Sequence, residues 1–236
     1  MPIILRTQSM AAPAGVREPA VFLVPHADDE TLTMGPAIEE HVNAGAHVIV
    51  VLVTDGHASA ARHLTGLSVE EFSAARDREF LAACAALGVP ETQVFFAHCP
   101  DGGLSPELAR AVVATWIGLF PAGRFRTMTW TDGHRDHAAL GSALRELAPP
   151  TADVRFYVKP DEWEVERERP PLQTERATTG RYLVASDQYA LVAPAAGRYG
   201  IGQLSVPEVF ALRRASDESR WHGLERQAPP GAPPRS

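Results

Sequence analysis

Residues 20–54 read AVFLVPHADDETLTMGPAIEEHVNAGAHVIVVLVT, and this stretch decides the fold. It contains two continuous apolar runs, 20–25 and 46–54, separated by a helical pattern over 34–45 that ends at Gly45. Continuous apolar runs are typical of strands that are buried on both faces of a parallel sheet. The order of strand, helix and strand therefore predicts a right-handed βαβ unit.

The same alternation continues beyond this unit. It predicts helices over 68–88, 106–120 and 137–147, and strands over 92–98, 124–130 and 154–159. Ser68 with Glu71 three residues later forms the capping-box pattern expected at a helix start. Strands that alternate with helices indicate an α/β fold of one domain, with a Rossmann-like, doubly wound, mostly parallel sheet and helices on both faces.

Regularity decreases after residue 150. We expect a charged, proline-bearing surface segment over 160–180, a late strand over 181–186, and a short helix or extended segment over 206–215. The composition of the last residues, RQAPPGAPPRS, is typical of disorder. The predicted organisation is a flexible segment over 1–19, a single catalytic-sized domain over 20–225 and a disordered proline-rich tail over 226–236.

The composition argues against several classes of partner. The chain of 236 residues carries a formal charge of −7 without any basic block, so we expect no nucleic-acid partner. The apolar cluster at residues 3–5 is too short for a signal peptide or a membrane span, so we expect a cytoplasmic protein with no membrane partner. Cys84 and Cys99 form no zinc or disulfide framework. Homo-oligomerisation stays open.

Histidines and carboxylates follow two of the predicted strands. The motif HADDE covers residues 26–30 directly after the first strand, and DGHRDHAALG covers residues 132–141 after the strand at 124–130. If the sheet is parallel, both motifs emerge at its carboxyl edge, where ligands bind in such folds. Two segments far apart in the chain can then form one site.

Imidazole and carboxylate groups are the ligands that zinc accepts, and three of them with one open position make a hydrolytic centre. His26, Asp29 and His137 are the candidate ligands. Asp28 lies beside them and can serve as general base. His134, as an imidazolium, can stabilise an oxyanion. Asp136 can either orient His134 or cap the helix, and the sequence favours neither role.

These residues resemble a known family, the LmbE-like, PIG-L-type zinc de-N-acetylases. The first family motif, His-Pro-Asp-Asp-Glu, is similar to HADDE, and the second, His-x-x-His, is similar to residues 134–137. RDREFLAACAALGV at 76–89 resembles the family's Arg-x-x-Glu helix, and DGGL at 101–104 resembles its Asp-x-Gly loop. The resemblance covers roughly residues 20–145.

The resemblance implies a fold, a reaction and a set of residue roles. It implies a Rossmann-like sheet, and one Zn²⁺ per chain with Fe²⁺ as an alternative in the cell. It also implies hydrolysis of the N-acetyl, or a similar acyl, group of a small amino-sugar substrate such as an N-acetylglucosaminyl metabolite. The implied roles are metal ligation by His26, Asp29 and His137, general base catalysis by Asp28, electrostatic catalysis by His134, and contacts to sugar hydroxyls by Arg76 and Asp101. Ala27 replaces the family's proline, and residues after 150 carry no family motif, so the acceptor remains undefined.

Other interpretations stay open at this point. HADDE alone can be a solvated helix start, and His134 with His137 alone can be surface polarity. Clustered carboxylates can also hold magnesium in a phosphoryl-transfer enzyme, although such a site does not need His26 and His137. A third alternative is a non-catalytic, metal-containing sugar-binding protein. Together, the motifs and their order favour the amidohydrolase.

Overall fold

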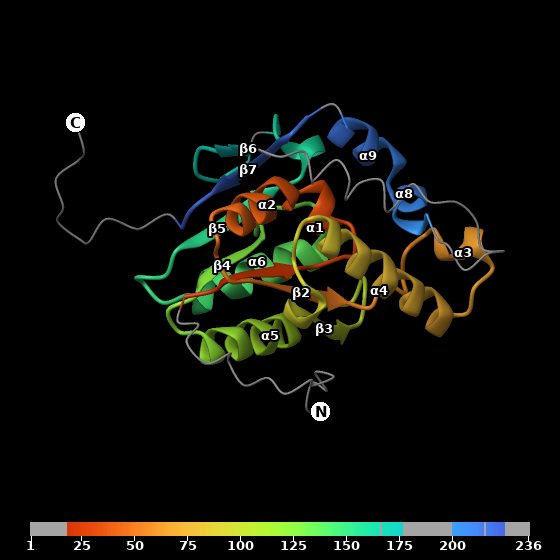
Figure 1. Ribbon diagram of the computed structural model, residues 1–236, viewed down its shortest axis with the longest axis horizontal. Helices are drawn as coiled ribbons and strands as arrows, with labels where there is room; N and C mark the ends of the chain where they lie inside the picture. The colour runs from red at the N-terminus through yellow and green to blue at the C-terminus, as the bar shows by residue number, and fades with distance from the viewer. Residues whose placement is uncertain (1–17, 166, 177–199, 215, 225–236) are drawn as a thin grey trace.

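The computed structural model describes residues 18–165, 167–176, 200–214 and 216–224 (Figure 1). Within these residues, seven strands form one sheet in the order β3-β2-β1-β4-β5-β7-β6. Their bounds are β1 Ala20–Val24, β2 Val48–Thr54, β3 Val94–Cys99, β4 Arg124–Met128, β5 Val154–Val158, β6 Gln173–Arg176 and β7 Glu218–His222. The first five strands run parallel to one another, whereas β7 pairs antiparallel with both β5 and β6.

The strand order changes direction between β1 and β4. The chain moves from β1 outward through β2 to β3, and then returns to the other side of β1 to add β4 and β5. In open α/β sheets, ligands bind at the carboxyl ends of the strands at such a switch point. The topology therefore places the candidate site beyond the ends of β1 and β4.

Helices cover both faces of the sheet. Their bounds are α1 Asp29–Leu32, α2 Gly35–Asn43, α3 Arg62–Thr65, α4 Val69–Ala86, α5 Pro106–Leu119, α6 Arg135–Leu147, α8 Ile201–Ser205 and α9 Pro207–Arg214. Figure 1 shows α2 and α4 on one side of the strands and α5 on the other. Alternate residues of β1 contribute to two separate cores, because Phe22 packs with the α2 and α4 side while Val21 packs with the α5 and α6 side.

Burial explains why the sequence predicts this half of the molecule well. Every residue of β1 and β2 is buried, so both strands appear in the sequence as unbroken apolar runs. Ser68 caps α4 as predicted: its side chain accepts from the backbone N–H of Glu71, and the Glu71 side chain accepts from the backbone N–H of Ser68. The α/β fold with a mostly parallel sheet is confirmed.

The carboxy-terminal part differs from its prediction. The charged segment over 160–180 contains the strand β6, and the polar sequence ESRWH forms β7. Neither strand has the apolar pattern that identifies a buried strand, since only one of the four β6 residues is buried and β7 contains charged side chains. The segment over 206–215 forms the helix α9, one of the two conformations expected.

The remaining expectations have different outcomes. The strand expected over 181–186, residues 1–17 of the flexible segment and residues 226–236 of the tail lie outside the described residues, so the domain limits stay a prediction. Cys84 and Cys99 are free and buried. Among the described residues, every helix is too short or too polar to cross a lipid bilayer.

Candidate metal and acid–base site

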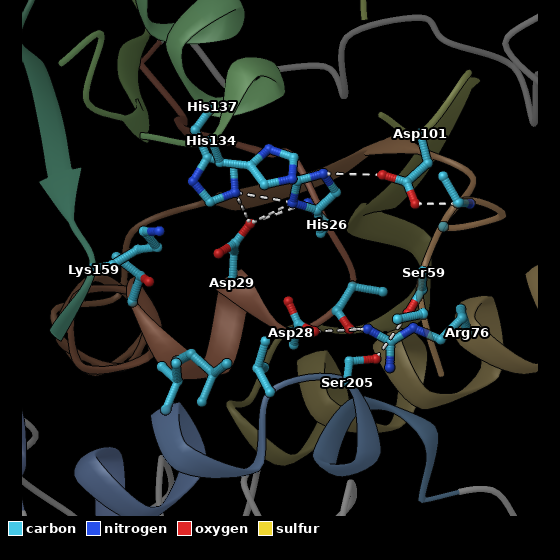
Figure 2. Close-up of a pocket in the computed structure, with 18 of the residues that line it drawn as sticks. His26, Asp28, Asp29, Ser59, Arg76, Asp101, His134, His137, Lys159 and Ser205 are labelled. Carbon is cyan, nitrogen blue, oxygen red and sulfur yellow. Dashed lines mark hydrogen bonds and ion pairs between the residues drawn. The ribbon is translucent and has the colours of Figure 1, made fainter. Parts of the chain in front are cut away.

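Two neighbouring strands position the site. His26 follows β1, and Asp28 and Asp29 begin α1, while His134 and His137 begin α6 after β4. Helix α6 can approach β4 closely because residue 141 is glycine: a Cβ there would lie 2.6 Å from the carbonyl oxygen of Met128. The close approach brings the first turn of α6 against the end of β1. Figure 2 shows the three histidines gathered above Asp29.

Three predicted ligands converge on one point. His26 Nδ1 lies 2.9 Å from His137 Nε2 and 3.4 Å from Asp29 Oδ2, and His137 Nε2 lies 3.1 Å from the same oxygen. A tetrahedral zinc ion with bonds of about 2.0–2.1 Å has ligand atoms about 3.3 Å apart. The three side chains therefore fit one divalent cation with little rearrangement.

Buried carboxylates orient both imidazoles. His137 Nδ1 lies 2.9 Å from Asp132 Oδ2, which leaves the Nε2 lone pair for a metal. His26 Nε2 lies 3.2 Å from both Asp101 Oδ1 and Asp136 Oδ2, which leaves Nδ1 for the same ion. Carboxylates on the second ring nitrogen are the usual partners of metal-binding histidines. The donor set thus has the hydrogen bonds that a metal centre requires.

Two other groups of ligand atoms also lie within 4.8 Å of one another in the described part of the chain. They are His26 with His134 and His137, and His26 with Asp101 and Asp136. In the second group, Asp136 already accepts hydrogen bonds from the backbone N–H groups of Gly102 and Leu104. We regard the His26, Asp29 and His137 set as the better site because Asp101 and Asp136 approach the opposite nitrogen of His26.

The charges of these groups depend on one another. Burial lowers the pKa of His137, but Asp29 and Asp132 outweigh burial and raise it to about 9. For Asp29, burial raises the pKa, but His137 and His26 outweigh it and hold the pKa well below the usual range. The carboxylates that stabilise a proton on His137 would stabilise a metal cation in the same place.

Asp28 lies beside the ligands without joining them. Burial raises its pKa, while Arg76 opposes the rise. The Arg76 guanidinium donates to Asp28 Oδ2 at 2.9 Å and to the carbonyl oxygen of Ala27. Arg76 thus contacts the candidate base directly, in addition to lining the cavity where we expect the sugar.

His134 is the N-cap residue of α6. Its Nδ1 accepts a hydrogen bond from the backbone N–H of Asp136 at 3.3 Å. An imidazolium carries a proton on both nitrogens, so it cannot accept this bond. Burial and the neighbouring His26 also lower the pKa of His134. The geometry thus favours a neutral ring with its proton on Nε2, in place of the imidazolium expected from the sequence.

The site opens into a cavity of 410 Å³. All seven predicted site residues line it: His26, Asp28, Asp29, Arg76, Asp101, His134 and His137. Ser205 of α8 and Val209 of α9 line its far wall. Figure 2 shows Lys159, which follows β5, on another side from Ser205. A volume of this size suits a sugar-sized ligand.

Sequence reasoning missed several contributors. Asp132 orients His137, and Lys159 Nζ lies 3.4 Å from Asp132 Oδ1. Asp136 neither orients His134 nor caps the helix with its side chain, because its carboxylate binds the 101–104 loop and His26. Asp132 was identifiable in principle, since it lies two residues before a candidate catalytic histidine, whereas Lys159 had no motif around it.

Comparison with known proteins decides the family. The family model described as PIG-L, GlcNAc-PI de-N-acetylase, matches residues 21–148, which is more than half of the chain. The chain belongs to this family. Membership places it among metal-dependent hydrolases that remove N-acetyl groups, and it confirms the resemblance seen in the motifs. The search of curated proteins finds no match.

Solved structures share the fold of this PIG-L family member at low sequence identity. The A40926 pseudoaglycone deacetylase Dbv21 has a TM-score of 0.67 at 19% identity, covering 90% of this chain and 100% of that one. The N,N'-diacetylchitobiose deacetylase from Pyrococcus horikoshii has a TM-score of 0.58 at 17% identity, covering 87% and 83%. The 4-carboxy-2-hydroxymuconate hydratase GalB from Pseudomonas putida has a TM-score of 0.61 at 15% identity, covering 92% and 100%. Since a hydratase shares the fold, the fold alone does not define the reaction.

Proposed function

We propose that this PIG-L family protein hydrolyses the N-acetyl group of an amino sugar, with Zn²⁺ held by His26, Asp29 and His137. The observation that carries the proposal is the convergence of three ligand atoms within 3.4 Å of one another, with Asp28 beside them. Two imidazoles and one carboxylate favour zinc over magnesium, which prefers oxygen ligands alone. When bound, the ion supplies Lewis acidity toward water and the amide carbonyl.

Asp28 is the proposed general base. Its Oδ2 is held by Arg76, so Oδ1 is the oxygen that accepts a proton from the attacking water. The same carboxyl group can then give that proton to the departing amine nitrogen. Burial raises the pKa of Asp28, which favours its holding the proton after the attack, while Arg76 opposes the rise and stabilises the carboxylate that acts as base.

His134 is the proposed electrostatic catalyst. Its Nδ1 is occupied by the backbone N–H of Asp136, so Nε2 donates to the carbonyl oxygen as negative charge develops there. The helix cap fixes the ring before substrate binds, so little reorganisation is needed during the reaction.

The proposed substrate is a small amino-sugar glycoside that enters the 410 Å³ cavity. The deacetylase relatives act on a diacetylchitobiose and on an antibiotic pseudoaglycone, which supports an N-acetylglucosaminyl unit with a variable acceptor. In this proposal Asp101, whose Oδ2 accepts from the backbone N–H of Ala58 and whose Oδ1 contacts His26 Nε2, also accepts a hydrogen bond from a sugar hydroxyl. We place the protein in the cytoplasm on its sequence composition.

The direct test is amine release from a panel of N-acetylglucosamine glycosides by protein loaded with zinc. We expect release of acetate and free amine in equal amounts, and loss of both in Asp28→Asn. Phosphate release from phosphorylated compounds in the presence of magnesium, with intact acetamides, would instead support the phosphoryl-transfer alternative. Bound zinc without turnover on the whole panel would support a binding protein.

A further inference from the structure

A buried acidic residue of helix α4, Glu79, lies next to the arginine that contacts the proposed base. Glu79 is one helical turn after Arg76, and it is 5% exposed. Its Oε2 accepts from Arg76 Nη1 at 2.9 Å, and its Oε1 accepts from the backbone N–H of Ile201 at 2.7 Å. Oε2 also accepts from the backbone N–H of Gly202 at 3.3 Å. Both oxygens of this buried carboxylate are therefore used.

The partners of Glu79 belong to two functional parts of the cavity. Arg76 holds Asp28, the proposed base, at 2.9 Å. Ile201 and Gly202 begin α8, whose last residue, Ser205, lines the cavity and lies 3.0 Å from Ser59 Oγ on the opposite loop. Figure 2 shows Arg76 reaching toward Asp28, with Ser205 and Ser59 nearby. Glu79 thus connects the wall of the cavity to the base.

A carboxylate at residue 79 is unfavourable because the position is buried. Removing its charge from water is unfavourable unless each oxygen is hydrogen-bonded. An apolar side chain could pack against α8, and Ile201 already packs with Phe72 and Ala75 of α4. Packing alone therefore does not account for a charged group at residue 79.

We propose that Glu79 is a positioning residue that directs the Arg76 guanidinium toward Asp28. Because Glu79 also binds the first residues of α8, it links the orientation of Arg76 to the position of that helix. The proposal rests on the function proposed above. An arginine side chain has several rotatable bonds, and a carboxylate on one side of its planar fork restricts where the other nitrogen points. With Glu79 on Nη1, Nη2 is directed at Asp28 and at the carbonyl oxygen of Ala27.

The arrangement has a consequence for substrate recognition. When α8 packs against α4, the backbone N–H groups of its first two residues donate to Glu79 and offset part of its negative charge. The helix that closes the cavity and the arginine that orients the base then depend on the same carboxylate. Formation of the cavity wall and preparation of Asp28 are coupled.

The test compares Glu79→Gln with a matched control, Glu70→Gln, on the same helix. Gln offers one acceptor oxygen where Glu79 uses two, whereas Glu70 is exposed and far along α4 from the base. Assays at pH 8 keep Glu79 ionised, since burial raises its pKa to about 7. We expect Glu79→Gln to lower kcat by roughly 10–100-fold, because small misplacements of catalytic groups cost this much. Zinc content should match that of the wild type.

A double-mutant cycle separates positioning from general destabilisation. If Glu79 acts through Arg76, the double variant that carries both Arg76→Gln and Glu79→Gln should have the same kcat as Arg76→Gln alone. A lower midpoint of thermal unfolding with an unchanged kcat in Glu79→Gln would overturn the proposal. Fully additive losses in the cycle would overturn it as well.

Crystal structures of wild type and Glu79→Gln give a readout that does not depend on activity. We expect the Arg76 guanidinium to leave Asp28 in the variant, and an unchanged contact would contradict the proposal. If the wild type releases no amine, the proposed function fails, while the two structures still decide the role of Glu79.

Discussion

The two halves of the sheet differ in how they contribute to the site. The parallel half, from β1 through α6, carries every proposed ligand, base and electrostatic catalyst. The carboxy-terminal half, from β5 onward, adds an antiparallel pair of strands and the helices α8 and α9, which form the far wall of the cavity. We infer from the comparison that the first half carries the proposed chemistry and that the second half is the candidate region for acceptor selection.

The largest effect on activity is expected from substituting a proposed metal ligand or the proposed base. His26→Ala and His137→Ala should lose zinc and at least about 10³-fold in activity, because each leaves only two ligands. Asp28→Ala should keep zinc and lose about 10²–10⁴-fold, the usual contribution of a general base. Metal analysis of each purified variant beside kcat is the measurement. Equal metal loss in all three variants would reject the distinction between ligands and base.

A second prediction concerns the close contact that positions α6. Gly141→Ala should lower the free energy of unfolding by about 1–3 kcal/mol, because the new Cβ would lie 2.6 Å from Met128 O and Trp130 N. Chemical denaturation measures the change. The control is Gly118→Ala in α5, where no atom lies within 4 Å of a new Cβ and where alanine should stabilise by about 0.5–1 kcal/mol. Equal behaviour of the two variants would contradict this account.

A third prediction uses one buried histidine from each half. Burial lowers the pKa of His41 in α2 to about 4, with Arg126 adding to the effect, and burial lowers the pKa of His222 in β7 to about 4. Below pH 6.5 the unfolded chain binds protons at both residues, whereas the folded protein does so only near pH 4. The share of the free energy of unfolding that comes from these two histidines should therefore fall as the pH drops from 6.5 to 4, by at most about 3 kcal/mol per histidine, whereas Glu79, whose pKa burial raises to about 7, contributes in the opposite direction.

Urea denaturation at several pH values tests this linkage. His222→Gln should remove the contribution of His222 to the pH dependence of the free energy of unfolding between pH 6.5 and 4. The contribution of His41 should remain. The difference between the wild-type and His222→Gln profiles isolates His222, and a difference that stays constant from pH 6.5 to 4 would show that His222 protonates as easily in the folded protein as in the unfolded chain.

A fourth prediction concerns the carboxylate behind His137. Asp132→Asn should weaken zinc binding by about 10–100-fold, the usual cost of losing a carboxylate on a metal-bound histidine. Competition with a chelator measures the affinity. Asp217→Asn is a suitable control, because Asp217 pairs with Arg176 on an exposed part of the carboxy-terminal half. Unchanged zinc affinity in Asp132→Asn would show that the Asp132 carboxylate does not support His137 as a ligand.

The smallest expected effect lies in the far wall. Val206→Ala enlarges the cavity beside α8 and should change KM by about 2–5-fold, in a way that depends on the acceptor, with kcat changed less. Steady-state kinetics on glycosides with different acceptors measures this. A large loss of kcat with every acceptor would place chemistry in the carboxy-terminal half and end the division between the two halves.

The two halves also differ in how far the sequence predicts them. Strands β1 and β2 are buried along their whole length, and the motifs HADDE and His134-x-x-His137 follow strands that are neighbours in the sheet, so their convergence was predictable. Strand β7 was not predictable, because its residues Glu218–His222 are polar and pair with strands distant in sequence.

Residue roles that depend on tertiary contacts also could not be predicted from the sequence. Spacing alone places Glu79 one turn after Arg76, but it does not show that Glu79 holds the start of α8, which is 122 residues away. The tautomer of His134 depends likewise on its position as the N-cap of α6. Local pattern identified the chemical groups, whereas packing determined how each one is held.

The most direct test of the central claim is a crystal structure of the protein with zinc, located by anomalous scattering. We predict one ion within about 2.0–2.2 Å of His26 Nδ1, Asp29 Oδ2 and His137 Nε2, with Asp28 outside the coordination shell. An ion bound instead by His26, Asp101 and Asp136 would contradict the account, because Asp29 and His137 would then have no part in the metal centre.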